Sequence, residues 1–237
     1  MAASNGYILF EDSVRIVIAT GFTRASANAK TGSMIQIWIL VKAENPLDAI
    51  KSGSDVAVCG DCPLRGTLGK GRACYVNLGQ APLAVWRAWQ RGTYQTLAAN
   101  SPDYDLLFTG RAVRFGAYGD PVFIPFEIVS RIAGFAKKHT GYTHQWQNPL
   151  YSAYKRFVMA SADSAALGTL ARSQGWRTFR VTPVGQLVLD AAEIVCANTT
   201  KGISCEQCGL CNGSQIGRAA VKSIAIEAHG AGKVHIG

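Results

Sequence analysis

The sequence contains no run of about 18 apolar residues, the length that a helix needs to cross a membrane. Its first residues, Met-Ala-Ala-Ser-Asn-Gly, lack the basic and then apolar segments of a secretion signal. From these two absences we expect a cytoplasmic protein without a membrane partner. The length of 237 residues and the 48% share of hydrophobic residues are enough for a full core, and we expect a single domain.

Acidic residues are also scarce. The chain has 15 Asp and Glu against 24 Lys and Arg, which gives a formal net charge of +9. Such an excess favours an anionic partner, nucleic acid among them, because binding to phosphates depends on the basic groups available to neutralise them. Thiolates bound to a metal would lower this net charge. The charge alone therefore does not identify the partner.

Isolated cysteines are missing, because all seven fall into two groups. The first contains Cys59, Cys62 and Cys74, and the second spans residues 196–211. An odd number of clustered cysteines without an export signal argues against a disulfide framework. It favours thiolates that are kept reduced for a metal, which makes all of them candidate ligands: Cys59, Cys62, Cys74, Cys196, Cys205, Cys208 and Cys211.

The second group has the spacing C-x2-C-x2-C at Cys205, Cys208 and Cys211. Bacterial ferredoxins use this spacing for three ligands of an iron-sulfur cluster, but they continue with x3-C-P, and this chain does not. A fourth ligand must come from elsewhere, and Cys196 is the nearest. We predict one or two iron-sulfur clusters of the four-iron type. Structural zinc is the alternative, although seven cysteines do not divide well into closed four-coordinate zinc sites.

A complete phosphate-binding loop is absent as well. Lys30-Thr31-Gly32 resembles part of one, but the motif G-x-x-x-x-G-K-[ST] must precede a helix, and here an apolar strand follows. We therefore predict a loop between strands at residues 26–33.

The first fifty residues have the pattern of an antiparallel β extension. Residues 7–20 alternate, are rich in β-branched side chains and turn at Glu11-Asp12-Ser13, which predicts a hairpin. Residues 35–41 form an apolar strand. Asn45 and Pro46 then provide the cap and the first position of a short helix.

From residue 53 to residue 237, short apolar segments alternate with polar loops and helices, the pattern of βα units and a parallel sheet. About seven such units predict an α/β protein with a partial or closed (β/α) barrel. The expected strands are 56–58, 73–77, 112–115, 141–146, 157–160, 178–181, 193–195 and 223–226, and the expected helices are 80–94, 126–138 and 165–174.

In parallel βα sheets, functional groups lie on the loops after the carboxyl ends of the strands. We expect the following residues, at or near the ends of predicted strands, to face one mouth: Cys59, Cys62, Asp120, His144, Asp163, Cys196 and His229. We take Asp120, His144 and His229 as candidate catalytic residues. Simpler roles stay open: Asp120 can cap a helix or shape a turn, the two histidines can be ordinary hydrogen-bonded loop residues, and Asp163 with Ser164 fits an N-cap better than an acid.

A three-cysteine group after an early strand, combined with a partial βα barrel, resembles the radical S-adenosylmethionine superfamily. The resemblance implies a four-iron cluster on three thiolates at the barrel mouth and a redox or radical enzyme. The group at Cys196 to Cys211 would correspond to an auxiliary cluster. The spacing differs, since that family uses C-x3-C-x2-C and this chain has C-x2-C-x11-C, and residues 116–121 contain no glycine-rich strand end with a matching Glu.

Three segments also resemble cysteine-rich proteins of uncharacterised function that bacteriophages encode: residues 27–32, Cys59-x2-Cys62-Pro63-Leu64-Arg65 and Ala228-His229-Gly230. This resemblance covers most of the chain. It implies a phage source and the cytoplasm of a bacterial host, and it implies no mechanism.

Two functions remain in competition. The first is an iron-sulfur enzyme with a small-molecule substrate or a redox partner, in which Cys59, Cys62 and Cys74 leave one iron open. The second is a zinc- or cluster-stabilised nucleic-acid-binding module of a phage. Arg65, Lys70 and Arg72 lie in the loop between Cys62 and Cys74, so we take Arg65 and Arg72 as candidate contacts to a cofactor or phosphate in either case. They can equally be solvated, or counter-charges to an anionic cluster.

Overall fold

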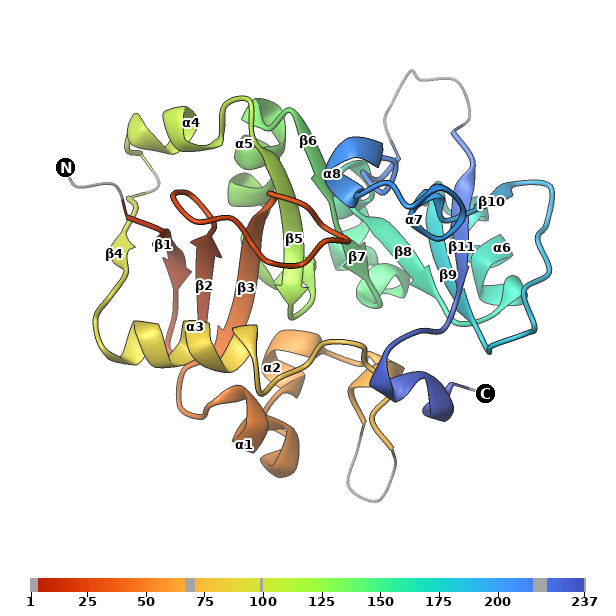
Figure 1. Ribbon diagram of the computed structural model, residues 1–237, viewed down its shortest axis with the longest axis horizontal. Helices are drawn as coiled ribbons and strands as arrows, with labels where there is room; N and C mark the ends of the chain where they lie inside the picture. Colours follow the sequence, from red (N-terminus) through yellow and green to blue (C-terminus); the bar gives the residue numbers. More distant parts are fainter. Residues whose placement is uncertain (1–3, 67–70, 99, 215–220, 237) are drawn as a thin grey trace.

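The computed structural model describes residues 4–66, 71–98, 100–214 and 221–236. It is a mixed α/β protein with one six-stranded and one five-stranded sheet, which lie in a row across the molecule (Figure 1). Neither sheet closes on itself among the described residues. The prediction of an α/β protein is confirmed, and a closed barrel is not found, because the outermost strands pair on one side only.

The six-stranded sheet has the order β4-β1-β2-β3-β5-β6. Strands β1, β2 and β3 pair antiparallel, whereas β3 with β5, β5 with β6 and β1 with β4 pair parallel. The predicted N-terminal β extension is therefore part of this sheet. Its strands are β1 (Gly6–Glu11), β2 (Arg15–Thr20), β3 (Ile35–Val41), β4 (Gln95–Thr96), β5 (Ala112–Tyr118) and β6 (Lys138–Thr140).

The five-stranded sheet has the order β10-β11-β9-β8-β7, and all its strands pair parallel. Only Gly141 separates β6, the edge of the first sheet, from β7, the edge of the second. A Cβ at Gly141 would lie 2.7 Å from a methyl of Val158, so the close approach at this junction needs glycine. The strands are β7 (Tyr142–Thr143), β8 (Met159–Ala162), β9 (Thr178–Thr182), β10 (Glu193–Val195) and β11 (Ser223–Glu227).

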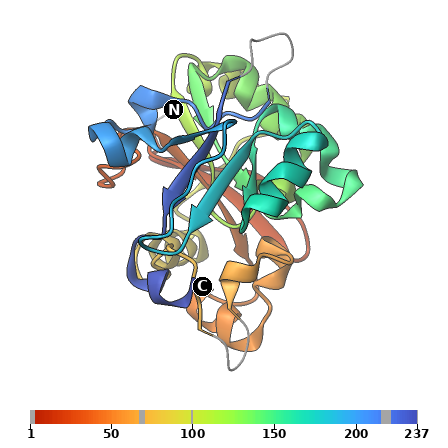
Figure 2. The same cartoon turned by 90° about the vertical axis from the view of Figure 1, so that its right-hand side faces the viewer.

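The helices connect and cover these strands. In Figure 2, α6 lies on one side of the five-stranded sheet, and α7 and α8 lie on the other. Ser164 caps α6 through the backbone N–H of Leu167, and Asn45 caps α1, as the sequence predicts. The α-helices are α1 (Pro46–Ser52), α2 (Val56–Cys59), α3 (Ala81–Gln90), α4 (Asp103–Phe108), α5 (Phe126–Phe135), α6 (Ala165–Ser173), α7 (Ala197–Lys201) and α8 (Cys205–Cys208); the 3-10 helices are η1 (Pro63–Arg65), η2 (Pro121–Phe123), η3 (Gln145–Gln147), η4 (Pro149–Arg156) and η5 (Ala231–His235).

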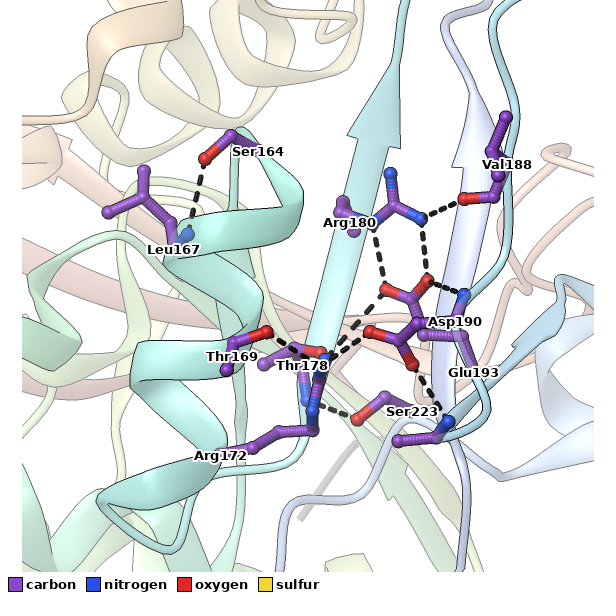
Figure 3. A network of polar contacts seen from close by, with 11 residues as sticks. Ser164, Leu167, Thr169, Arg172, Thr178, Arg180, Val188, Asp190, Glu193 and Ser223 are labelled. Carbon is purple, nitrogen blue, oxygen red and sulfur yellow. Dashed lines mark hydrogen bonds and ion pairs between the residues drawn. The ribbon is translucent and has the colours of Figure 1, made fainter.

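A buried polar network holds the far end of the five-stranded sheet (Figure 3). Arg180 of β9 donates from Nε and Nη2 to the two carboxylate oxygens of Glu193 in β10, at 2.8 and 2.5 Å. Arg172 of α6 donates to Asp190 at 2.5 Å, in the loop before β10. The network therefore joins β9 to β10 and α6 to the loop before β10. It helps to fix β10, which is followed directly by Cys196.

Two predicted strands before α3 are wrong. Residues 56–58 belong to α2, where the N–H of Cys59 donates to the carbonyl of Asp55 and the N–H of Gly60 to that of Val56. So short an apolar run fits either element by pattern alone. Residues 73–77 form no regular element, because the Arg72 guanidinium occupies the carbonyls of Cys74 and Val76 that a neighbouring strand would otherwise bind.

Other bounds also shift: α3 ends at Gln90 and not at Tyr94, and β8 covers Met159–Ala162 in place of 157–160. Strand β5 runs three residues beyond its predicted end at Phe115, across a register shift at Gly116, whose φ is +69°. Helix α5 ends at Phe135, so that Lys138 begins β6. Residues 144–147 belong largely to η3 and not to the predicted strand, of which β7 keeps only Tyr142–Thr143.

Candidate functional site

One cavity of about 440 Å³ lies against both sheets. Its wall includes alternate side chains of β5, such as Arg114 and Tyr118, and of β9, such as Phe179 and Val181. All the candidate site residues named from the sequence lie on the same wall: Cys59, Cys62, Cys74, Cys196, Cys205, Cys208, Cys211, Asp120, His144, His229, Arg65 and Arg72. The seven cysteines are all free thiols.

The first cysteine group is built by short backbone turns. The N–H of Cys62 donates to the carbonyl of Cys59 at 3.3 Å, and the N–H of Cys74 donates to the carbonyl of Leu64 at 2.8 Å. Burial raises the pKa of the Cys59 thiol, and the neighbouring Cys62, Asp55 and Cys74 raise it further. Burial also raises the pKa of Cys74. The raised pKa values of Cys59 and Cys74 favour the neutral form of these two thiols.

The two arginines of this segment hold its backbone. Arg65 donates to both carboxylate oxygens of Asp55, at 2.7 and 3.2 Å, and to the carbonyl of Gly53. Arg72 donates to the carbonyls of Cys74 and Val76, at 3.1 and 2.9 Å. Their guanidinium groups are thus engaged with the protein although both side chains line the cavity. Lys70, the third basic residue of the predicted contact loop, lies outside the described residues.

The second cysteine group lies between β10 and the segment after α8. Burial raises the pKa of Cys211 to about 12, and Cys205, Cys196 and Cys208 contribute in the same direction, whereas a hydrogen bond with the hydroxyl of Tyr142 lowers it. Burial raises the pKa of Cys205, and Cys196 and Cys208 raise it further, whereas the charge of Arg114 lowers it. Cys196 is therefore an electrostatic neighbour of Cys205 and Cys211, and it packs against the same small apolar cluster as Cys211.

Arg177 supports the loop of the second group. Its guanidinium Nη1 donates to the carbonyls of Leu210 and Gly213 at 2.8 and 2.9 Å, and to the side-chain oxygen of Asn212 at 3.1 Å. Nε and Nη2 donate to the carbonyls of Val221 and Lys222. One side chain therefore binds both residues 210–213 and residues 221–222.

His144 contacts one carboxylate and one thiol at the cavity wall. Its Nε2 lies 3.3 Å from Oδ1 of Asp163, and its ring also has a side-chain hydrogen bond with Cys62. Burial lowers the pKa of His144, but the hydrogen bonds and the charges of Asp163 and Cys62 outweigh it and raise the pKa to about 10. Ser164, and not Asp163, caps α6, so Asp163 is available to His144.

Asp120 has a positioning role. Its carboxylate accepts from the N–H of Val122 at 3.2 Å, at the start of η2, and from the N–H of His144 at 2.9 Å. Burial raises its pKa, and these hydrogen bonds oppose the shift. The turn-shaping role that the sequence left open for Asp120 thus describes its contacts, and through them it fixes the backbone that carries His144.

The space between the two cysteine groups contains aromatic and basic side chains. His229 stacks on Tyr75, with ring centroids 6.2 Å apart and an interplanar angle of 29°. The hydroxyl of Tyr75 accepts a hydrogen bond from Arg114, whose guanidinium carbon lies 5.7 Å from the centroid of the Tyr75 ring. Tyr142, the partner of Cys211, also lines the cavity and is partly buried.

Thiols are donors both for zinc and for iron-sulfur clusters. Four thiolates at about 2.3 Å from one zinc must lie within about 4 Å of each other. In the described part of the chain, no group of three or more His, Cys, Asp or Glu side chains could hold one metal ion. The thiolates of a cluster bind different irons and stand further apart. Seven free thiols line the one cavity described above.

Sequence reasoning missed Arg114 and Tyr118. Both project from β5, which was expected to end at Phe115, so Tyr118 fell into a predicted loop. The signal was present: Arg114, Gly116 and Tyr118 alternate with Val113, Phe115 and Ala117, and a charged residue at the polar positions of a buried strand marks the face that is not core.

Comparisons with protein-family models, with curated proteins and with solved structures find no match to this chain. Among the described residues, no helix is both long enough and apolar enough to span a membrane.

Proposed function

We propose that this protein binds iron-sulfur clusters in the cavity and acts as a redox or radical-type enzyme. The observation that carries the proposal is the arrangement of the cysteines: all seven are free, and all line one cavity in two groups of neighbours. Clustered reduced thiols are the ligands that iron-sulfur clusters require.

The two groups suit different tasks. Cys196, Cys205, Cys208 and Cys211 offer four thiols, enough to complete a cluster, with Arg177 fixing the loop. Cys59, Cys62 and Cys74 offer three, which would leave one iron without a protein ligand and open to a substrate or cofactor. A cluster supplies electrons one at a time at a potential that hydrogen bonds and charge adjust. His144, bonded to Cys62, is placed to make that adjustment.

A radical-S-adenosylmethionine-like partial barrel is the architecture that we propose for this function. It is supported by the parallel pairing of every neighbouring strand from β3 through β5 and β6, and from β7 to β10. The cavity against these strands, with cysteines on its wall, agrees with such a mouth. The C-x2-C-x11-C spacing is the departure from the family motif, so S-adenosylmethionine binding needs its own test.

The decisive experiment is anaerobic purification followed by absorption spectroscopy and iron and sulfide analysis. We expect a brown protein that absorbs near ~400 nm and contains iron and sulfide together, whereas zinc is colourless. Colourless protein that carries stoichiometric zinc after anaerobic iron and sulfide reconstitution would contradict the proposal.

The second candidate function is a metal-stabilised nucleic-acid-binding module, which the net charge of +9 favours. Many basic groups are already engaged, however, as with Arg65 on Asp55 and Arg180 on Glu193. Binding of duplex and single-stranded oligonucleotides at low salt tests this function, because affinity should fall by about one log unit per log unit of salt for each phosphate contacted. Salt-independent or undetectable binding favours the enzyme.

A further inference from the structure

The central strand of the cavity wall carries a charged and a polar side chain on one face. Arg114, Gly116 and Tyr118 of β5 line the cavity, whereas Val113, Phe115 and Ala117 are buried in the hydrophobic core. All three residues line the same cavity, although the pairing of β5 with β3 shifts register between Arg114 and Tyr118. At Gly116 a Cβ would meet the carbonyl oxygen of Gly119 at 2.6 Å, so the strand cannot carry a larger side chain between the two polar ones.

Arg114 is buried without an acidic partner. Its exposed fraction is 9%, and within the described residues no Asp or Glu lies at ion-pair distance from it. Its one hydrogen-bond partner there is the neutral hydroxyl of Tyr75. Removing a guanidinium from water is costly unless a counter-charge compensates. Other arginines of this chain do have carboxylate partners: Arg15, Arg65, Arg131, Arg172 and Arg180.

Tyr118 adds an unused hydroxyl to the same wall. Its exposed fraction is 4%, and its phenolic oxygen has no hydrogen-bond partner in the described part of the chain. Buried hydroxyls usually have partners, because an unpaired one has lost its contacts with water. Arg114 and Tyr118 are four residues apart on β5. The buried cation and the buried hydroxyl therefore both lack a partner that a ligand can supply.

We propose that the cavity between the two cysteine groups binds a small organic anion. Its carboxylate or phosphate pairs with Arg114, and a second polar group of the same molecule bonds the hydroxyl of Tyr118. The flat aromatic surface of Tyr75, stacked on His229, lies beside the charged end. The assignment of an anion-binding site depends only on β5 and the residues around it. The further claim that this anion is the substrate rests on the proposed iron-sulfur function.

The alternative counter-charge for Arg114 is the thiolate of Cys205, which is near enough to raise the pKa of Arg114. This role would affect the second cluster and leave the cavity without an anion site. The two roles differ in what a neutral substitution changes: small-anion binding in one case, iron retention by the second group in the other. The experiment therefore measures both quantities on the same samples.

The test is calorimetric titration of the anaerobically purified protein at constant ionic strength. One arm uses inorganic phosphate and pyrophosphate, and the other uses acetate and succinate. The variants are Arg114→Gln, Arg114→Lys and Tyr118→Phe. Arg87→Gln is the matched control, because Arg87 is exposed on α3 and does not line the cavity. Circular dichroism verifies the fold, and iron is quantified in every sample.

We expect saturable binding in one arm, which then identifies the anionic group. Arg114→Gln should weaken it about tenfold or more, since hydrogen bonds to a charged group are among the strong ones. Tyr118→Phe should weaken it by a smaller factor, Arg114→Lys should retain part of it, and Arg87→Gln should not change it. The proposal is overturned by absence of saturable binding in both arms, or by equal affinity of wild type and a folded Arg114→Gln.

The two proposals can fail separately. Protein without iron that still binds the anion through Arg114 contradicts the proposed function alone. Protein with full iron content and no anion binding contradicts the anion site alone. A loss of iron in Arg114→Gln, with anion affinity unchanged, would assign Arg114 to the cluster and overturn its ligand role.

Discussion

Arg180 and Glu193 form an ion pair with two hydrogen bonds, although their strands are not neighbours in the sheet. Arg180 is on β9 and Glu193 on β10, and β11 separates these strands in the sheet. The residue of β11 that pairs with Arg180 is Ala225, whose small side chain leaves room for the guanidinium on this face. Glu193 is fully buried, and it begins the strand whose end leads to Cys196. The pair therefore links the stability of the sheet to the position of a cysteine.

We predict that Glu193→Gln destabilises the protein by about 3 to 5 kcal/mol, because it leaves the Arg180 charge buried without its partner. Urea denaturation with and without reducing agent measures the change. The double variant Arg180→Met/Glu193→Leu should recover much of the loss, since an apolar pair removes both charges. Asp48→Asn is the control for an exposed ion pair and should change the stability far less than Glu193→Gln. Equal stability of Glu193→Gln and wild type would contradict the prediction.

A second prediction follows from the separation of the cysteines into two groups. Cys205→Ser and Cys208→Ser should lower bound iron and the yield of soluble protein, because the energy of metal binding is partly folding energy, roughly ~10 kcal/mol or more in thiolate-rich zinc sites. Cys62→Ser should remove iron from the first group alone. Iron analysis and electron paramagnetic resonance of the three variants distinguish the groups. Full iron content in both variants of the second group would refute its role as a ligand set.

Arg177 offers a test of loop support without a change in any ligand. Arg177→Lys keeps the charge but cannot form the five contacts that the guanidinium makes with residues 210–213 and 221–222. We expect faster hydrogen exchange in residues 208–214 and faster loss of iron from the second group. Iron of the first group should be retained. Arg156→Lys, an exchange at a side chain outside the cavity wall, is the control.

Local signals in the sequence predicted much of this fold. Strand Ile35–Val41 was predicted with its observed bounds, and Asn45 caps α1. These features depend on a few neighbouring residues. The run at 56–58 was predicted wrongly, because its conformation depends on contacts such as that between Asp55 and Arg65, which no local pattern contains. The division into two sheets at Gly141 likewise depends on tertiary packing against Val158.

The candidate site divides in the same way. The motif spacing identified the cysteines, and the rule for the carboxyl ends of parallel strands led to the expectation of one mouth, although Cys59 in fact ends a helix. The engagement of Arg65 and Arg72 by the protein could not be predicted, because their acceptors are set by the folded backbone. Arg114 could have been predicted as a site residue from the alternation of polar and apolar residues in β5, but only if the strand had been predicted to end at Tyr118.

The hairpin turn gives a prediction about pH. Burial raises the pKa of Asp12, but hydrogen bonds from the N–H groups of Arg15 and Val14 and the Arg15 guanidinium outweigh it and hold the pKa below 3.8. A lowered folded-state pKa stabilises the protein above the unfolded value, and this contribution is lost as the pH falls through the folded value. Asp12→Asn should therefore cost about 0.5 to 1 kcal/mol at pH 7.

The measurement is urea denaturation of wild type and Asp12→Asn at pH 7, 5 and 3. The difference between the two proteins should be constant from pH 7 to pH 5 and should shrink as the pH falls below 3.8. Comparing the two proteins at each pH removes the contribution of other groups that titrate in acid. A difference that grows on acidification would show that Asp12 does not stabilise the fold through its charge.

The last prediction concerns His144, which lies between Asp163 and Cys62. A positively charged donor near a cluster sulfur stabilises the reduced, more negative cluster, and hydrogen bonds to the sulfurs are among the factors that set its potential. Replacement of His144 by Phe removes the donor, so we expect a more negative midpoint potential for the first cluster. Asp163→Asn should shift the potential by less than His144→Phe, because the removed negative charge of Asp163 and any loss of positive charge on His144 oppose each other. The potential of the second cluster should not change in either variant.

Anaerobic redox titration followed by electron paramagnetic resonance measures both potentials, and His235→Gln is the control because His235 is exposed and does not line the cavity. A structural role alone would lower the iron content of His144→Phe without shifting the potential of the cluster that remains. His144→Gln, which can still donate a hydrogen bond but carries no charge, should give an intermediate potential. A shift of the second cluster and not the first would contradict the contact between His144 and Cys62 as the cause, since the described contacts of His144 reach only the first group.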